Sequence, residues 1–352
     1  MKHGRALQLL AGGLIAGAGL WIFFRDVDLS RLGEELTGHP PGVLLACAGL
    51  VLLSLKLRAI RWRIMLPQVR TAHNRGLFGH VMIGFMVNNI VPARVGEAVR
   101  VLLLWRKNGY GVTTAIGSLI LERAIDIVVF GTFFIVPVLI LDSLEPLRSY
   151  ALIMAGGCAL AGIVFFLYVA APGLVRTAFK RTLTIVPAKL RRRTSMIARE
   201  LASNLDWTSS PLRIGVVLVL SYLIAFCFSL MLLLLSDRFT VPGVIRSMFA
   251  QACAVMGAAI PLSPGYVGTL HATLLEGLSY LGQSREKARA IAILYHALAY
   301  IPVTAVGLVY FFRTDLRFRD LSHAKEDLKE QTRQTDMTQD HAPTPRGNDE
   351  QQ

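Results

Sequence analysis

Charged residues are scarce in this sequence of 352 residues, and its few cysteines are not paired. Charged side chains make up 17% of the residues and hydrophobic ones 53%, whereas a typical soluble domain is about 25% charged. The four cysteines lie singly in different apolar segments, which excludes a paired metal or redox motif. The sequence has no GxSxG, Walker, HExxH or dinucleotide-binding motif in the strand and helix setting that such a motif requires. We therefore predict no catalytic residues, no metal ligands and no cofactor.

Long apolar runs are abundant and indicate a membrane protein. Six of them are close to the roughly 20 residues that a membrane-spanning helix needs; they cover residues 6–24, 41–57, 112–141, 150–171, 211–235 and 288–312. Two more apolar stretches, 76–105 and 243–281, are interrupted near the middle by Pro and Gly. Irregular backbone survives at membrane depth only where protein or water satisfies its polar groups. The predicted fold is all-α and polytopic, with about six full spans and two re-entrant hairpins.

The basic residues predict the orientation. The net charge is +14, and about 22 Lys and Arg fall on the side of the N-terminus and of the loop 172–210, against about 8 on the other side. Both termini are therefore expected in the cytoplasm, with the chain in the cytoplasmic (inner) membrane. Because the basic residues flank spans, as in "RTAFKRTLTIVPAKLRRRTSMIARE", we expect contact with anionic lipids and not with nucleic acid.

The chain divides into an integral membrane domain, residues 1–315, and a polar tail, residues 316–352. The first apolar run is expected to stay as a span, because "GLWIFFRDVDLS" offers no small-x-small cleavage site. The tail has mixed charge and no apolar periodicity, which predicts disorder.

The two interrupted stretches resemble each other. A shift of 172 residues lays "LFGHVMIGFMVNNIVPARVGEAVRVL" on "FAQACAVMGAAIPLSPGYVGTLHATL", so that Pro92, Val95 and Gly96 meet Pro264, Val267 and Gly268. By the span count, the first hairpin enters from the cytoplasm and the second from the opposite face. Broken segments in corresponding positions of two halves are a sequence sign of an inverted-repeat transporter. We predict repeats at 41–141 and 211–312.

Ionisable residues at membrane depth mark the candidate site. Arg94, Glu97 and Arg100 follow the first break, and "LERAID" places Glu122, Arg123 and Asp126 inside the next span. Six charges facing lipid would cost on the order of 15 to 20 kcal/mol, so they must face inward. Glu122 and Asp126 share a helical face, and Arg123 points about 100° away. The network either docks the hairpin onto the span or binds an anionic head group, for which the arginine fork is suited.

The second hairpin adds "PLSPGYVGTLH", in which glycines permit close approach of the backbone. His271 is an ionisable group there, and His296 lies on the last span; a histidine in a span is commonly a hydrogen-bonded packing residue. The predicted substrate-binding residues are Asn89, Arg94, Gly96, Glu97, Arg100, Glu122, Arg123, Asp126, Pro264, Gly265, Gly268 and His271.

Four motifs in order, "RAIRWRIML", "NNIVPARVGEAVR", "LERAID" and "PLSPGYVGT", resemble the flippase-like membrane family that includes the transmembrane portion of lysylphosphatidylglycerol synthetases. The resemblance implies a lipid-handling role, with motif positions at Arg94, Gly96, Glu97, Glu122, Arg123, Asp126, Pro264, Gly265 and Gly268. Two residues depart from the family pattern: Tyr266 replaces a Gly, and His271 stands in place of a Glu. The sequence ends about 40 residues after its last predicted span, so we expect a stand-alone membrane domain without the soluble synthase domain.

Three functions fit these observations. The first is transbilayer movement of a lipid or lipid-linked anionic head group. The second is a membrane-embedded lipid-modifying transferase, using aminoacyl or polyprenyl-linked glycosyl groups, because "RDVDLS" gives Asp26 and Asp28 a DxD spacing. The third is a non-transporting partner of an envelope or lipid-synthesis enzyme.

Overall fold

A computed structural model of the protein describes residues 40–67, 75–91, 94–170, 206–236, 240–259 and 264–314, together with residues 30, 33, 34 and 37–39. The described residues form nine α-helices and no strand, which confirms the all-α prediction. These helices are α3 (Pro41–Met65), α4 (Leu77–Ile90), α5 (Val95–Asn108), α6 (Val112–Ile140), α7 (Arg148–Ala170), α10 (Pro211–Ser236), α11 (Val241–Ala259), α12 (Thr269–Tyr280) and α13 (Arg285–Phe312). The predicted span 6–24, the DxD sequence and the tail lie outside the described residues.

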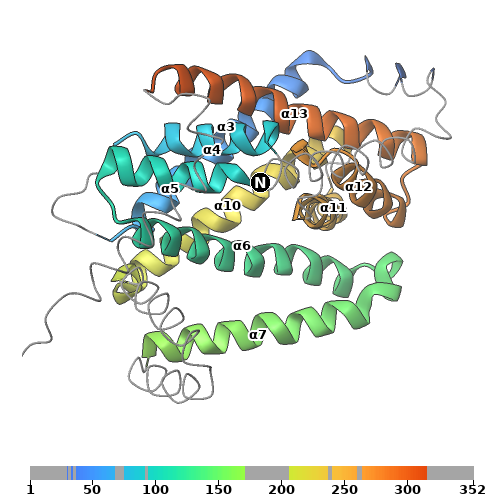
Figure 1. The fold of residues 1–352 in the computed structure, drawn as a ribbon. Helices are drawn as coiled ribbons and strands as arrows, with labels where there is room; N and C mark the ends of the chain where they lie inside the picture. The colour runs from blue at the N-terminus through green and yellow to red at the C-terminus, as the bar shows by residue number, and fades with distance from the viewer. Residues whose placement is uncertain are drawn as a thin grey trace, which may run out of the picture.

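Five helices of the described part of the chain are long and apolar enough to cross a membrane. Four of them, α3, α6, α10 and α13, coincide with predicted spans, and the fifth is α11. The helix α7 coincides with the predicted span 150–171. It packs against α6 at the edge of the molecule (Figure 1). The chain is therefore a polytopic helical membrane protein, as predicted.

The outer faces of the long helices are apolar. Leu45 on α3, Ile153 on α7 and Leu212 on α10 are 74%, 75% and 77% exposed. Apolar surface of this extent needs a non-aqueous neighbour. These faces are therefore the lipid-facing surface of the protein.

The first interrupted stretch is a helical hairpin made of α4 and α5, as predicted. Each helix has 14 residues and is about 21 Å long, which is shorter than the hydrocarbon core of about 30 Å. The chain leaves α4 through an extended Val91 and enters α5 through Arg94, whose backbone is left-handed at φ 51°. A Cβ at Gly96 would meet the carbonyl oxygen of Gly84 and, at 2.6 Å, Oδ1 of Asn88. Glycine therefore allows α4 and α5 to touch.

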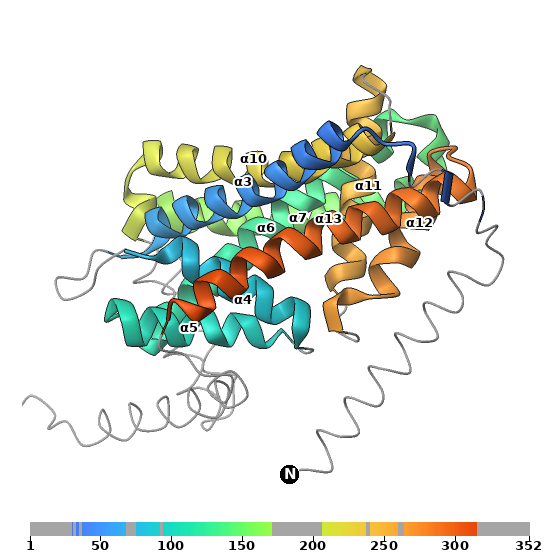
Figure 2. The same ribbon diagram turned by 90° about the horizontal axis from the view of Figure 1, so that it is seen from above.

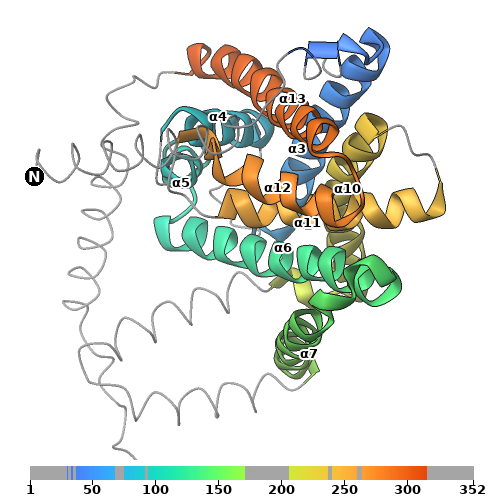
Figure 3. The ribbon, with the colours of Figure 1, turned by 90° about the vertical axis from the view of Figure 1, so that its right-hand side faces the viewer.

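The second interrupted stretch is a hairpin made of α11 and α12, joined through the short 3-10 helix η3 (Pro264–Tyr266). Its tip is built on positive φ angles at Gly265 (60°), Tyr266 (61°) and Gly268 (88°). The helix α11 is seen end-on in Figure 1 and lengthwise in Figure 2, so it lies across the long helices. Viewed from the side, α11 and α12 lie between α6 and α13 (Figure 3). The second hairpin is therefore enclosed by spans.

The helix bounds repeat with the offset found in the sequence. Moving α6 forward by 172 residues gives 284–312, and α13 covers 285–312. The same shift brings α3 to 213–237, beside α10 at 211–236, and the end of α5 to residue 280, where α12 ends. The same shift would move α4 to 249–262, whereas α11 covers 241–259, so the agreement is partial and the internal repeat stays a prediction.

Candidate functional site

Glu122, on the buried face of α6, is the centre of an ionic network. Its side chain is fully buried. Arg58 of α3 donates a hydrogen bond to its Oε1 at 2.9 Å. Arg100 of α5 donates to both of its oxygens, at 3.1 and 2.8 Å. One carboxylate thus connects a span, the first hairpin and a second span.

Asp126 lies one helical turn further along α6 and holds the other side of the same network. It accepts hydrogen bonds from Arg58 at 2.8 Å and from Arg61 at 2.7 Å. Arg61 also donates to the hydroxyl of Ser221 on α10 at 2.8 Å. We call Arg58, Arg61, Arg100, Glu122 and Asp126 the arginine–carboxylate network.

Trp62, on α3, orients Arg100. Its indole Nε1–H donates to the hydroxyl of Ser118 at 3.0 Å, and this fixes the ring. The guanidinium of Arg100 lies over that ring, 4.2 Å from its centroid. A desolvated cation–π contact of this kind contributes about 2 kcal/mol. The side chain of Arg100 is therefore held from two helices, by Glu122 of α6 and by Trp62 of α3.

The network carries an excess of positive charge. Its three arginines face two carboxylates, and all five residues are buried. Nε and Nη2 of Arg61 and Nε of Arg100 are buried and have no hydrogen-bond acceptor among the residues that the structure describes. Uncompensated charge is costly at membrane depth. The arrangement therefore favours an approaching anion.

A partly exposed ion pair, which we call the rim pair, covers the network. Nε of Arg123 lies 3.3 Å from Oε1 of Glu97, and the two side chains are 36% and 31% exposed. Arg123 was expected to point away from the acids of its own helix, yet its guanidinium also lies 3.5 Å from Glu122 and from Asp126. The rim pair is therefore the point at which the network meets its surroundings.

The tips of the two hairpins meet beside the rim pair. Arg94, at the first tip, donates through Nη2 to the carbonyl oxygens of Ala258 and Ala259, at 3.1 and 3.3 Å. These carbonyls end α11, where the helix dipole favours a cation. Tyr266, at the second tip, lies in the electrostatic field of Arg94, Glu97 and Arg123. Arg94 thus docks one hairpin onto the other.

Asn89 and Gly96 have structural contacts in this conformation. The Nδ2 group of Asn89 donates to the hydroxyl of Thr304 on α13 at 2.9 Å. The backbone N–H of Gly96 donates to Oδ1 of Asn88 at 2.8 Å, which closes the first tip. Both residues therefore position the hairpin that carries Glu97 and Arg100.

The predicted residues of the second hairpin form a separate cluster. The backbone N–H of Gly268 donates to Nδ1 of His271 at 3.4 Å, and Nε2 of His271 lies 3.0 Å from Nδ1 of His296 on α13. Gly265, directly after Pro264, approaches the first hairpin: a Cβ there would lie 3.2 Å from the carbonyl oxygen of Asn89. The histidine pair thus holds the second tip against α13.

Arg58 and Arg61 were not among the predicted site residues. They stand at the end of α3, in "RAIRWRIML", where basic residues also serve to orient a span. The sequence did contain a signal: Arg58 and Arg61 are three positions apart, and residues at this spacing share one helical face. Only the packing of α3 on α6 and α10 shows that this face is turned inward.

Comparisons with known proteins agree with this architecture. The chain is 24% identical over 327 residues to a "UPF0104 membrane protein" of Methanothermobacter thermautotrophicus, covering 88% of this chain and 95% of the relative. It is 27% identical over 154 residues to "Glycosyltransferase AglD" of Haloferax volcanii, covering 44% of this chain and 25% of that protein. Residues 9–307 match the family described as "Lysylphosphatidylglycerol synthase TM region". The chain is therefore a member of the lysylphosphatidylglycerol synthase transmembrane family.

Proposed function

We propose that the protein moves a lipid with an anionic head group from one leaflet of the cytoplasmic membrane to the other. The observation that carries this proposal is the excess of arginine over carboxylate in the buried network. Membership of a family named after a lipid synthase also supports a lipid as the substrate. The head group would bring the negative charge that the network lacks.

The rim pair is the entrance in this proposal. Arg123 and Glu97 are each about one-third exposed, and a phosphate can replace a carboxylate on the fork of an arginine. The head group would displace Glu97 from Arg123 and then face Arg58, Arg61 and Arg100. Each of these arginines already has its orientation fixed by a carboxylate or by Trp62.

The hairpin tips provide the moving part. Arg94 holds the second hairpin through two carbonyl groups, and the hydroxyl of Tyr300 donates to the carbonyl oxygen of Asn89 at 3.3 Å. A few polar contacts of this kind exchange more readily than a packed apolar core. If the two hairpin tips separated, Tyr266 would move away from the rim pair and the rim pair would become accessible.

The direct test uses the Arg123→Gln variant in reconstituted vesicles. The full chain is placed in vesicles that contain fluorescent phosphatidylglycerol, and transbilayer movement is followed by quenching of the outer leaflet. We expect movement to slow at least tenfold, which corresponds to about 1.4 kcal/mol. Because Arg123 is partly exposed, the variant should remain folded, and thermal unfolding checks this.

Arg148→Gln is the matched control. Arg148 is 40% exposed and pairs with Asp142 and Glu145 at the surface, so its loss should leave movement unchanged. A folded Arg123→Gln protein that moves lipid at the normal rate would contradict the site. Vesicles with the unaltered protein that behave like empty vesicles would contradict the function.

A second candidate is a membrane-embedded transferase, favoured by the partial match to the glycosyltransferase. Its predicted metal ligands are Asp26 and Asp28, because carboxylates are the hard ligands that such a metal needs. We expect the double change to Asn to leave function near normal. Complete loss of function, with loss of metal dependence in a folded protein, would support the transferase.

A further inference from the structure

Two histidines are in contact where the second hairpin tip meets α13. His271, near the start of α12, is 7% exposed, and its Nε2 lies 3.0 Å from Nδ1 of His296. His296 is the twelfth of the 28 residues of α13, which places it about 17 Å from the start of a helix about 42 Å long. The pair therefore lies near the middle of a span, where an ionisable group is by default functional.

The hydrogen bonds of the pair fix the positions of its protons. Nδ1 of His271 accepts the backbone N–H of Gly268 at 3.4 Å, so the ring proton of His271 is on Nε2. That proton is donated to Nδ1 of His296, whose own ring proton is therefore on Nε2. The ring of His296 also forms a hydrogen bond with the backbone of Gly265. Both rings are thus neutral in this conformation, and both Nδ1 atoms are occupied as acceptors.

A further proton cannot bind to the pair while the tip keeps both hydrogen bonds. On Nδ1 of His271, the proton would face the N–H of Gly268. On Nδ1 of His296, it would face the Nε2–H of His271. If that Nε2–H proton moved to Nδ1 of His271, it would face Gly268 again. Because two hydrogens point at each other in every arrangement, uptake of a proton breaks one of the bonds that hold the tip.

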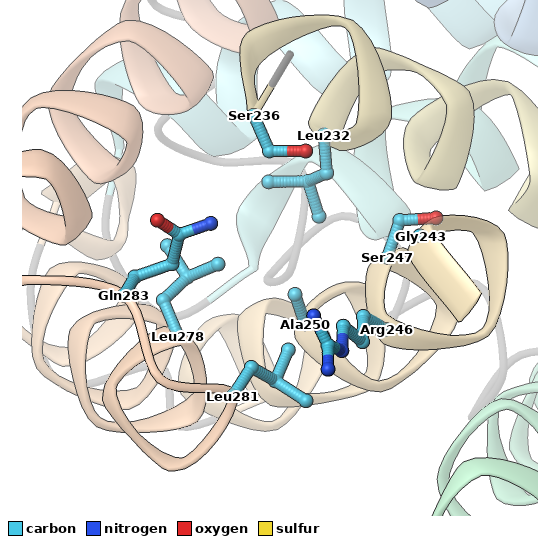
Figure 4. Close-up of a pocket in the computed structure, with 9 residues that line it drawn as sticks. All are labelled: Leu232, Ser236, Gly243, Arg246, Ser247, Ala250, Leu278, Leu281 and Gln283. Carbon is cyan, nitrogen blue, oxygen red and sulfur yellow. The ribbon is translucent and has the colours of Figure 1, made fainter. Parts of the chain in front are cut away.

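The charged side chains of the surrounding helices lie away from the pair. Glu276 of α12 is exposed and pairs with Arg285 at 3.0 Å. Glu286 precedes His296 by ten positions on α13, about 15 Å along the helix, and α4 and α11 contain no acidic residue. Arg246 of α11 lines a hollow at the end of α10 (Figure 4). Among the described residues of these helices, no carboxylate is therefore placed to balance a positive charge on the pair.

The other titratable groups of these elements have different neighbours. Tyr295 of α13 donates to Gln251 of α11 at 2.8 Å. Tyr266 of η3 lies beside the rim pair. Arg289 precedes His296 by seven positions on α13, and Cys253 of α11 lies against Gly277. A proton on the histidine pair would therefore be a new charge in a neutral setting, and such a charge needs water.

The same face of α13 also holds the first hairpin, through groups that do not titrate near neutral pH. Tyr300, one turn after His296, presents its ring edge-on to that histidine, with 5.7 Å between the ring centroids. Its hydroxyl donates to the carbonyl oxygen of Asn89 at 3.3 Å. Thr304, one turn further, accepts a hydrogen bond from Asn89 at 2.9 Å. Of the two hairpins, the second is thus the one whose attachment to α13 depends on histidines.

We propose that the histidine pair is a proton-binding site, and that uptake of one proton releases the second hairpin tip from α13. The proton comes from water, one hydrogen bond of the pair breaks, and water hydrates the positive charge as the tip opens. The tip closes when the proton leaves. Because the closed pair is neutral and the open pair carries one proton more, acid favours the open tip. Histidines in contact with water titrate near pH 6.5, and below this value each pH unit favours opening about tenfold.

The test measures the distance between two spin labels on the full chain in detergent. The labels are attached through Met256→Cys, near the second tip, and Ile301→Cys, beside Tyr300; the native side chains are 52% and 62% exposed. The four native cysteines are replaced by alanine, and thermal unfolding checks the fold. From about pH 8 to about pH 5, we expect the population with the longer distance to rise at least tenfold.

The double variant His271→Gln, His296→Gln should abolish this response, because amides can donate and accept hydrogen bonds but do not titrate. His80→Gln is the matched control: His80 is a buried histidine on a helix of the first hairpin, and its loss should leave the response unchanged.

An equal distance distribution at both pH values would overturn the proposal, and this measurement does not depend on the folding of a histidine variant. A folded double variant that keeps the pH response would also overturn it, because another group would then bind the proton. The sample contains no lipid, so the result is separate from the proposed transport. A chain that opens in acid but moves no lipid in vesicles would keep the proton site and lose the transport function.

Discussion

Arg94 and Tyr266 lie 172 residues apart and share a left-handed backbone, with φ angles of 51° and 61°. Within the described ranges they are the two non-glycine residues with positive φ, a conformation that is uncommon for residues with a side chain. Each reverses the chain shortly before the second helix of its hairpin, α5 or α12. A rare conformation at matching positions supports the internal repeat better than a few identical residues do.

The two halves of the predicted repeat differ in chemistry. The positions that match Glu122 and Asp126 are occupied by Leu294 and Leu298 in the second half, so the arginine–carboxylate network belongs to the first half. The second half instead carries the histidine pair at its hairpin tip. The predicted repeat thus has an ionic network in its first half and a hydrogen-bonded histidine pair in its second half.

Replacing Glu122 should destabilise the protein more than any surface charge change does. Glu122→Gln keeps the shape of the side chain but leaves Arg58 and Arg100 without their shared counter-ion. Removing one partner of a buried ion pair typically costs about 3 to 5 kcal/mol. Thermal or denaturant unfolding in detergent measures the loss.

Glu145→Gln provides the comparison for that measurement. The Glu145 side chain is 70% exposed and pairs with Arg148 at 3.5 Å. Exposed pairs contribute about 0 to 1 kcal/mol. Equal stability of the two variants would mean that the buried network does not hold α3, α5 and α6 together.

Gly96→Ala should loosen the first hairpin. The new methyl group would strike the carbonyl oxygen of Gly84 and the side chain of Asn88, and overpacking of this kind costs about 1 to 3 kcal/mol. The matched control is Gly156→Ala on α7, where a Cβ would meet nothing within 4 Å and alanine favours the helix. If both variants unfold at the temperature of the unaltered protein, α4 and α5 are not in close contact.

Local patterns in the sequence predicted the helices, whereas contacts between residues far apart in the sequence could not be predicted. Span length, apolar content and Pro–Gly breaks are local properties, so the bounds of α6, α10 and both hairpins could be predicted. Arg94 stays a predicted ligand-binding residue, and in the structure it donates to the carbonyl oxygen of Ala258, 164 positions away, a contact that no local pattern encodes. Arg58 was missed because a basic residue at a helix end has an equally good explanation in membrane orientation.

The orientation in the membrane is tested by a reporter fused at residue 192. The loop 172–210 and both termini are predicted to be cytoplasmic, because about 22 basic residues then lie on that side against about 8. A phosphatase that is active only outside the cytoplasm should therefore be inactive at residue 192. The same reporter fused after Asp142, between α6 and α7, should be active. The reverse pattern would invert the topology.

The histidine pair should show strong energetic coupling. Nε2 of His271 lies 3.0 Å from Nδ1 of His296, and Nδ1 of His271 accepts the N–H of Gly268. His271 Nε2–H must therefore donate and His296 Nδ1 accept. His296→Phe leaves the Nε2–H of the buried His271 without its acceptor, which costs about 1 to 3 kcal/mol.

A double-mutant cycle separates this bond from simple packing. His271→Phe and the double variant complete the cycle, and unfolding free energies are compared for all four proteins. Replacing both partners by apolar rings removes the unsatisfied donor, so the double variant should be more stable than the sum of the single losses predicts, by about 0.5 to 3 kcal/mol. Additive losses would show that the two rings pack independently. The bond between the two histidines would then not be what holds the second tip against α13, and lipid movement should tolerate loss of either histidine.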